Sequence, residues 1–174
     1  DTDELLVSDA GVLKRVDYSH IKSNPTHIAR IENDSDVTSL SALNCFSSTY
    51  DIYKVVFYMA NTQSAGDMRM RFQKHFDDGG VASSTYLKLS GYDVYNGASS
   101  GLAGEILIAY PYLRSNNRIH ISYQGVADGS SGVITYVGSW VYSGSEVATG
   151  LQFYSSDSSL RFRKAEINVY GYNK

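Results

Sequence analysis

The sequence predicts an all-β protein, a jelly-roll-like antiparallel β-sandwich preceded by a short N-terminal hairpin. The first observation is the abundance of strand-forming aromatic residues, with 15 Tyr, six Phe and one Trp in 174 residues. The second is the presence of 15 Gly and only 2 Pro, which suits strands joined by tight turns. The third is an alternation of apolar and polar residues in many short stretches without intervening helical patterns, which is typical of a sandwich or barrel.

The clearest alternation lies between Met68 and Phe72. Met68, Met70 and Phe72 share one face of the expected strand, while Arg69 and Arg71 share the other. Further strands are expected at residues 52–60, 85–90, 105–112, 118–124, 133–142, 148–154 and 160–170. Turn-forming residues separate them at 77–80, 96–97, 116–117, 128–129 and 155–159.

The last expected strand changes phase within its own length. Phe162 belongs to one phase of the alternation, whereas Ala165, Ile167 and Val169 belong to the opposite one. A β-bulge near Arg163-Lys164 would place all of them in the core, because one extra residue reverses the side-chain direction.

The N-terminal region forms a separate element in this interpretation. Residues 4–8 and 12–16 flank Asp9-Ala-Gly11, a pattern that favours a hairpin. Asp17 is placed to cap a short helical turn through Tyr18–Lys22, which Pro25 would end. We therefore divide the chain into a hairpin and linker at residues 1–27 and a β-sandwich domain at 28–174. Because the chain starts at Asp1 rather than Met, we expect it to be a fragment of a longer chain or a processed product.

Two expected strands, residues 52–59 and 106–113, are apolar on both faces. A solvated antiparallel sheet normally alternates, so both faces of these strands should be covered. The cover could be the chain's own Val12–Ile31 segment, or it could be a neighbouring copy of the chain.

Composition and charge exclude several partners. The net charge is −3 and no block of Lys or Arg occurs, which argues against binding of nucleic acid. No apolar run approaches the roughly 18 residues needed to span a bilayer, so membrane insertion is not expected. The single cysteine, Cys45, excludes an intramolecular disulfide and has no basic neighbour that would activate it as a nucleophile.

The sequence lacks the usual patterns of catalysis. The five Glu residues are isolated from one another, and the four His residues have no metal-binding spacing. We therefore expect no enzyme activity, no cofactor and no metal site. Asp34-Ser-Asp36 and Asp77-Asp-Gly-Gly80 could supply calcium ligands, but both also form good turns without a metal.

Recognition is the remaining role, and aromatic residues with small polar neighbours are its usual contacts. Such residues cluster near expected turns in two places. Trp140 and Tyr142 are the first candidates for a binding surface, and Tyr95 with Asp93 are the second. The alternative interpretation places Trp140 and half of the tyrosines in the core.

Several segments resemble the C-terminal modules of bacteriophage tail-fibre and fibre-like virion proteins. The N-terminal stretch Asp3–Tyr18 is similar to the segment that links an upstream repetitive region to those modules. Similar strands occur at residues 50–57, 68–72, 149–153 and 166–171. The resemblance implies a jelly-roll-like sandwich, usually trimeric, with no shared catalytic residues.

The resulting expectation is a phage virion protein, a homotrimeric tail-fibre tip or similar appendage on the particle surface. Residues 1–27 would attach it to an upstream shaft. Its partners would be other copies of itself, other virion proteins, and a receptor on the host surface, either a glycan or a protein. The alternatives are a capsid decoration or neck-fibre protein, and, from another class, a carbohydrate-active enzyme or its carbohydrate-binding module.

Overall fold

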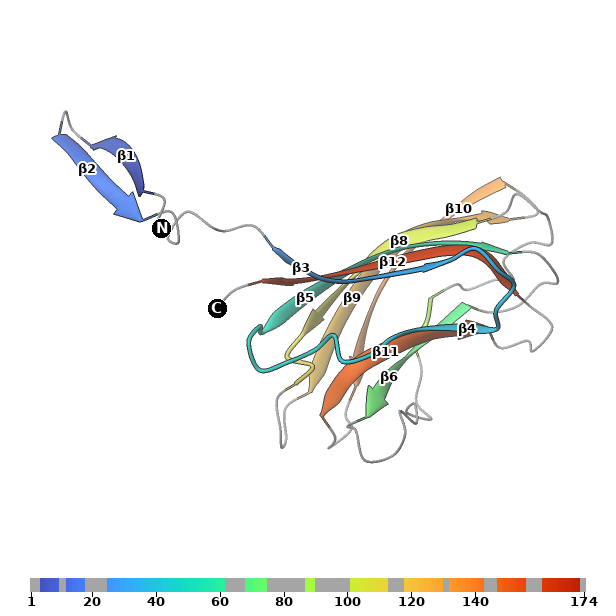
Figure 1. Ribbon diagram of the computed structural model, residues 1–174. Helices are drawn as coiled ribbons and strands as arrows, with labels where there is room; N and C mark the ends of the chain where they lie inside the picture. Colours follow the sequence, from blue (N-terminus) through green and yellow to red (C-terminus); the bar gives the residue numbers. More distant parts are fainter. Residues whose placement is uncertain are drawn as a thin grey trace.

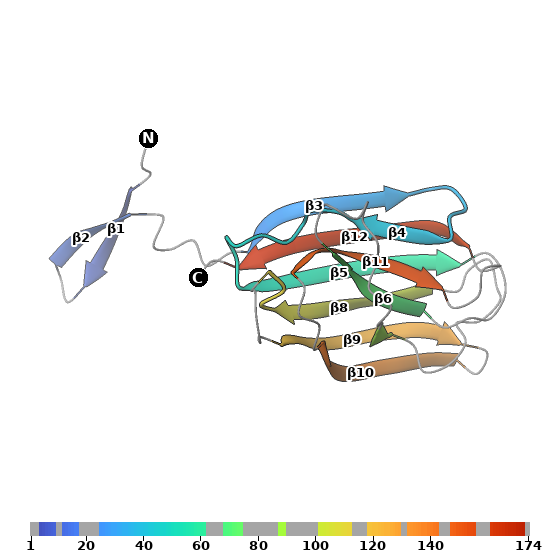
Figure 2. The ribbon, with the colours of Figure 1, turned by 90° about the horizontal axis from the view of Figure 1, so that it is seen from below.

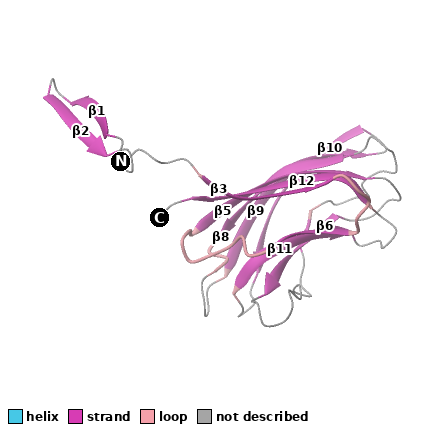
Figure 3. Ribbon diagram, in the orientation of Figure 1, coloured by secondary structure: helices cyan, strands magenta, loops and turns pink. Residues whose placement is uncertain are grey.

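The computed structural model describes residues 4–9, 12–17, 25–61, 68–74, 87–89, 101–112, 118–129, 132–142, 147–155 and 161–172. All regular secondary structure in these ranges is β-strand, with no helix, which confirms the predicted all-β class (Figure 3). The predicted helical turn at Tyr18–Lys22 and the predicted turns at 77–80, 96–97 and 116–117 lie outside these ranges.

Two antiparallel sheets pack face to face as a sandwich (Figure 1). The larger sheet has the strand order β10 (Gly132–Tyr142), β9 (Ile119–Gly129), β8 (Gly101–Ala109), β5 (Ile52–Asn61), β12 (Phe162–Tyr172) and β3 (Thr26–Asn33). The smaller sheet has the order β4 (Ser39–Ala42), β11 (Ala148–Ser155), β6 (Met68–Lys74) and β7 (Leu87–Lys88). Figure 2 shows the larger sheet from β3 at one edge to β10 at the other.

The order of the strands is that of a jelly roll, so this part of the prediction is confirmed. The chain alternates between sheets from β3 to β6, forms β7 beside β6, and returns to the larger sheet at β8. Strands β11 and β12 then insert between earlier strands, β11 between β4 and β6 and β12 between β3 and β5. The β9–β10 hairpin is an addition to this plan that widens the larger sheet beyond β8.

Alternating side chains of both sheets fill the core between them. On β5 the inward residues Tyr53, Val55, Phe57 and Met59 are all buried. On β6 the predicted inward set is confirmed, since Met68, Met70 and Phe72 are buried. The hydroxyl of Tyr53 stays satisfied because it donates to the carbonyl of Ser47 at 2.9 Å and accepts from the Ser47 amide at 2.8 Å.

The predicted bulge in β12 is confirmed. Pairing with β5 shifts register between Phe162 and Lys164, so Arg163 is the extra residue. Phe162 on one side of the shift and Ala165 and Ile167 on the other are all buried, while Arg163 is exposed. The bulge therefore returns both phases of the sequence to the core, as expected from the period of two.

Some strand boundaries differ from the predicted ones. The sequence did not predict β3 as a strand, nor the short β4. β8 ends at Ala109 rather than at residue 112, because Tyr110 adopts a left-handed backbone with φ of 60° and Pro111 follows. The predicted turn at Asp128-Gly129 is wrong, since both residues belong to β9 and pair with β10.

The outward face of the doubly apolar strands is not covered by the segment at 26–31. That segment is the edge strand β3, which pairs beside β12. As a result Ile52, Val56 and Leu107 keep 43%, 37% and 40% of their surface exposed. The outer face of the larger sheet thus leaves several apolar side chains open, and exposed apolar patches of this kind often mark binding sites.

The predicted N-terminal hairpin is confirmed. Strands β1 (Glu4–Asp9) and β2 (Val12–Asp17) pair antiparallel from Glu4 opposite Asp17 to Asp9 opposite Val12. They form a two-stranded sheet of their own and pair with no described strand of the sandwich (Figure 1). The first sandwich strand, β3, begins at Thr26, just before the predicted start of the domain at residue 28.

Candidate functional site

Side chains on the outer face of the larger sheet align in rows across five strands. Register places Asn168 beside Val56, Val56 beside Glu105, Glu105 beside Gln124, and Gln124 beside Val137. Neighbouring strands lie about 4.8 Å apart, so these residues form one continuous row. The next row consists of Glu166, Tyr58, Ala103, Val126 and Thr135.

These two rows line a groove of about 650 Å³, within the range of roughly 300–1,000 Å³ common for small-ligand sites. Gly104 and Gly125, which also line the groove, pair directly with each other. A Cβ atom on Gly104 would lie only 2.4 Å from the carbonyl oxygen of Gln124. This close approach of two backbones requires glycine. The added Cβ would also lie 3.0 Å from the buried ring of Phe57, so Gly104 belongs to the inward phase of β8 and lines the groove with its backbone alone.

One wall carries a cross-strand polar cluster. The ammonium of Lys54 on β5 forms an ion pair with Glu105 on β8, and Gln124 Nε2 on β9 donates to Glu105 Oε1 at 2.7 Å. The hydrogen bond from Lys54 is the main cause that lowers the pKa of Glu105, and the bond from Gln124 acts in the same direction. The same contact raises the pKa of Lys54. Glu105 is therefore ionised at neutral pH and held in one orientation.

A second polar cluster lies at the opposite wall. Asn168 Nδ2 donates to Glu166 Oε1 at 2.7 Å, and this bond is the main cause that lowers the pKa of Glu166. Arg30 on β3 lies 3.3 Å from the same oxygen through Nε and also pairs with Glu32. His27 Nε2 lies 3.2 Å from Asn168 Oδ1. Glu166 is thus a second oriented carboxylate with a lowered pKa.

The groove combines oriented polar groups with an apolar bottom. Val56, Val126 and the ring of Tyr58 supply apolar surface, and each remains between 37% and 45% exposed. Carboxylates accept hydrogen bonds, and side-chain amides both donate and accept them. Such a set can bind the hydroxyl groups of a ligand while C–H groups pack on Tyr58 and the valines.

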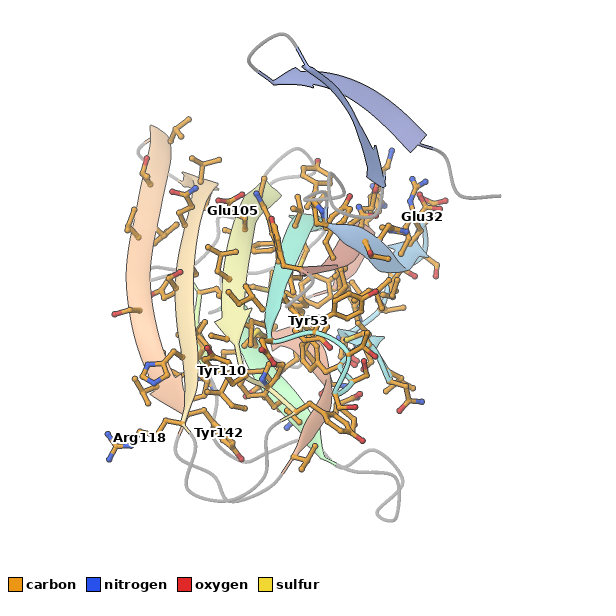
Figure 4. All side chains as sticks on the ribbon, turned by 90° about the vertical axis from the view of Figure 1, so that its left-hand side faces the viewer. Glu32, Tyr53, Glu105, Tyr110, Arg118 and Tyr142 are labelled. Atoms are coloured by element: carbon orange, nitrogen blue, oxygen red, sulfur yellow. The ribbon has the colours of Figure 1, made fainter. Side chains whose placement is uncertain are left out.

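Two smaller hollows continue the groove at its ends. One, of about 210 Å³, shares Glu105, Gln124 and Val137 with the groove. The other, of about 280 Å³, shares Tyr58 and Glu166 with it and extends to Arg30, Glu32, Asp34 and Lys164. Figure 4 shows Glu105 and Glu32 at separate places on the outer side of this sheet, with Tyr53 between the sheets. The surface therefore suits an elongated ligand better than a single small ring.

The residues proposed from the sequence lie elsewhere. Trp140 and Tyr142 belong to strand β10 rather than to a loop, and both side chains pack on Phe72 of the smaller sheet. Tyr142 is only 7% exposed and belongs to the core, and Trp140 packs against that core partly buried. The structure thus favours the core interpretation of both. Tyr95 and Asp93 lie outside the described residues.

The groove residues were not identified from the sequence, although a signal for them exists. On β12 the polar residues Glu166 and Asn168 alternate with buried Ala165, Ile167 and Val169. This alternation marks an outward polar row. The alternation does not indicate that β12 lies two strands from β8, which carries Glu105. Only the strand order of the folded sheet brings Glu166, Asn168 and Glu105 to one groove.

Two acidic stretches, Asp34-Ser-Asp36 and Asp77-Asp-Gly-Gly80, were the sequence's candidates for calcium ligands. In the ranges that the structure describes, no three His, Cys, Asp or Glu side chains gather as possible ligands. The loop at Asp34-Ser-Asp36 is held by polar contacts of Asn33, whose Nδ2 donates to the carbonyls of Ser35 and Phe162. Asp77-Asp78 lies outside the described residues.

No protein-family model matches the chain, and no curated protein matches it significantly. The described part of the chain contains no helix that could span a membrane.

Proposed function

We propose that the chain is a non-catalytic recognition module that binds a neutral glycan in the groove on the outer face of the larger sheet. The observation that carries this proposal is the groove's combination of two oriented carboxylates, two amides and an exposed tyrosine ring. A sugar matches this combination, because its hydroxyl groups can bind the carboxylates and amides while its C–H face packs on the tyrosine ring. The ion pairs of Glu105 with Lys54 and of Glu166 with Arg30 leave little net charge in the groove, which suits a ligand without charge.

The setting that we propose for this binding is the surface of a phage virion. This part of the proposal rests on the resemblance to tail-fibre modules. In such an appendage several copies face the same host cell, so that weak binding at each groove adds up to firm attachment. The ligand would then be a glycan of the host surface.

Binding is a better account of the groove than glycoside hydrolysis. Hydrolysis needs a carboxylic acid with a raised pKa beside a second carboxylate. The pKa values of Glu105 and Glu166 are both lowered, so both side chains act as hydrogen-bond acceptors at neutral pH. They are also offset by one row on strands that β5 separates, which places their Cα atoms roughly 12 Å apart.

The experiment is a glycan array with the whole 174-residue chain, followed by calorimetric titration of the best ligand. Tyr58→Ala should weaken binding at least about tenfold, equivalent to about 1.4 kcal/mol, because it removes the ring on which the sugar stacks. Tyr110→Ala is the matched control, since Tyr110 is 42% exposed against 44% for Tyr58 but does not line the groove.

The control should bind within about twofold of the wild type. Equal losses in the two variants, or an array on which no glycan binds, would contradict the proposal. Release of free sugar from a bound oligosaccharide would instead support the enzyme alternative.

A further inference from the structure

Strand β10 lies at one edge of the larger sheet, and it carries the two most exposed valines described. Val133, Val137 and Val141 keep 75%, 77% and 42% of their surface exposed, and all three point to the outer face. One side of β10 pairs with β9 along its whole length, and no described strand pairs with its other side. An apolar strand with an open edge is a place where another strand can add to the sheet.

The two edges of this sheet differ in their protection. The opposite edge strand, β3, carries His27, Arg30 and Glu32, and charged residues of this kind discourage pairing with another chain. β10 extends over 11 residues and contains no charged residue and no proline. In the part of the chain that the structure describes, this strand therefore lacks the charges and the proline by which many edge strands avoid association.

The sequence of β10 is also complementary to itself. In an antiparallel pair centred on Val137, Val133 of one copy would face Val141 of the other, and Thr135 would face Ser139. Valine thus meets valine, and a hydroxyl residue meets a hydroxyl residue. The outward residues of β10 are thus uncharged and symmetric about Val137, so β10 is suited to pair with the same strand of a second copy of the chain.

We propose that β10 pairs antiparallel with β10 of a second copy, about a two-fold axis at Val137, so that two larger sheets become one continuous sheet. This association is separate from glycan binding and does not depend on it. The trimer implied by the tail-fibre resemblance requires three-fold symmetry, which a two-fold strand pair cannot provide. The stoichiometry in solution therefore distinguishes the two arrangements.

The pairing has one consequence that rests on the proposed function. A two-fold axis perpendicular to the sheet keeps the outer faces of both copies on the same side. Since Thr135 and Val137 of β10 line the groove, the two grooves would open side by side on one surface. Such a dimer would present two glycan sites to one cell surface.

The test is light scattering on the whole chain during size-exclusion chromatography. The wild type should have twice the mass of the 19.2 kDa chain. Val137→Lys should be a monomer, because two ammonium groups would meet at the axis, and Val137→Glu should be a monomer for the same reason. An equimolar mixture of these two variants should regain the dimer mass, because opposite charges would then face each other.

Leu43→Lys is the control for adding a lysine at an exposed apolar position, since Leu43 is 58% exposed and lies beside β4. This variant should stay dimeric. Circular dichroism should give the same β-sheet spectrum for all variants, which separates lost pairing from lost folding. A wild-type monomer or trimer would overturn the proposal, and so would a dimer that both Val137 variants retain.

Discussion

Replacing Trp140 by alanine tests whether this residue supports the fold or contacts a ligand. The Trp140 ring stacks on Phe72 at 6.3 Å between ring centroids with an interplanar angle of 9°, and it meets the edge of Tyr142 at 5.8 Å. Phe72 belongs to β6 and Trp140 to β10, so this aromatic cluster ties the added hairpin to the smaller sheet. Truncation of Trp140 would remove that connection.

The expected loss follows from burial and ring contacts. Truncating a fully buried large aromatic residue to alanine costs about 3–5 kcal/mol, and each aromatic pair contributes about 0.5–1.5 kcal/mol of such a total. Trp140 is only partly buried, so we expect Trp140→Ala to lower the free energy of unfolding by about 2–4 kcal/mol. For a chain of this size the melting temperature should fall by roughly 5–15 °C.

The assay is urea denaturation followed by far-ultraviolet circular dichroism, since the protein has only one tryptophan and its fluorescence disappears in the variant. Trp140→Phe keeps a ring against Phe72 and should lose less than half as much stability. Ser139→Ala, at the neighbouring exposed position, should change little. An unchanged melting temperature in Trp140→Ala, combined with weaker ligand binding, would refute the core interpretation and restore Trp140 as a contact residue.

Two further predictions concern titratable groups. Burial raises the pKa of Cys45 to about 12, so at pH 8 a thiol reagent should react slowly with the native protein and quickly in urea; rapid native labelling would contradict its burial. The Lys54–Glu105 pair lowers the pKa of Glu105 and raises that of Lys54. Its stabilisation, about 0–1 kcal/mol for a partly exposed pair, should be lost as pH falls through the lowered pKa of Glu105, below the ordinary 4.5. On the alkaline side it should be lost as pH rises through the raised pKa of Lys54, above 10.5. Urea titrations of the wild type and Glu105→Gln should therefore differ by a constant amount between these limits, and a difference that grows toward low pH would show that the pair is not responsible.

Much of the fold was predictable from local patterns. The alternation at Met68–Phe72, the hairpin around Asp9–Val12 and the phase change at Arg163 each depend on residues close in sequence. The strand at Thr26–Asn33 was not predicted, because an edge strand with charged residues has only a weak alternation of apolar positions. Short β4 is held by pairing with β11, which is distant in sequence.

The candidate site was not predictable in the same way. Trp140 and Tyr142 were predicted to be contact residues because they cluster near an expected turn, yet their phase on β10 directs them to Phe72 in the other sheet. Alternation indicates which side chains face the core only where one of the two sets is polar, as on β6. For β10 both sets are rich in apolar residues, so the choice depends on what the smaller sheet presents.

By itself, then, the sequence determined most of the β-strands, the bulge in β12 and the N-terminal hairpin, because these follow from backbone preferences and from a side-chain period of two. The tertiary structure alone decided that Glu105 and Asn168 share one row with Val56 between them. It also decided that the valines of β10 stay exposed. Both outcomes depend on the order and register of strands far apart in the chain, and strand order is settled by how the two sheets close around one core.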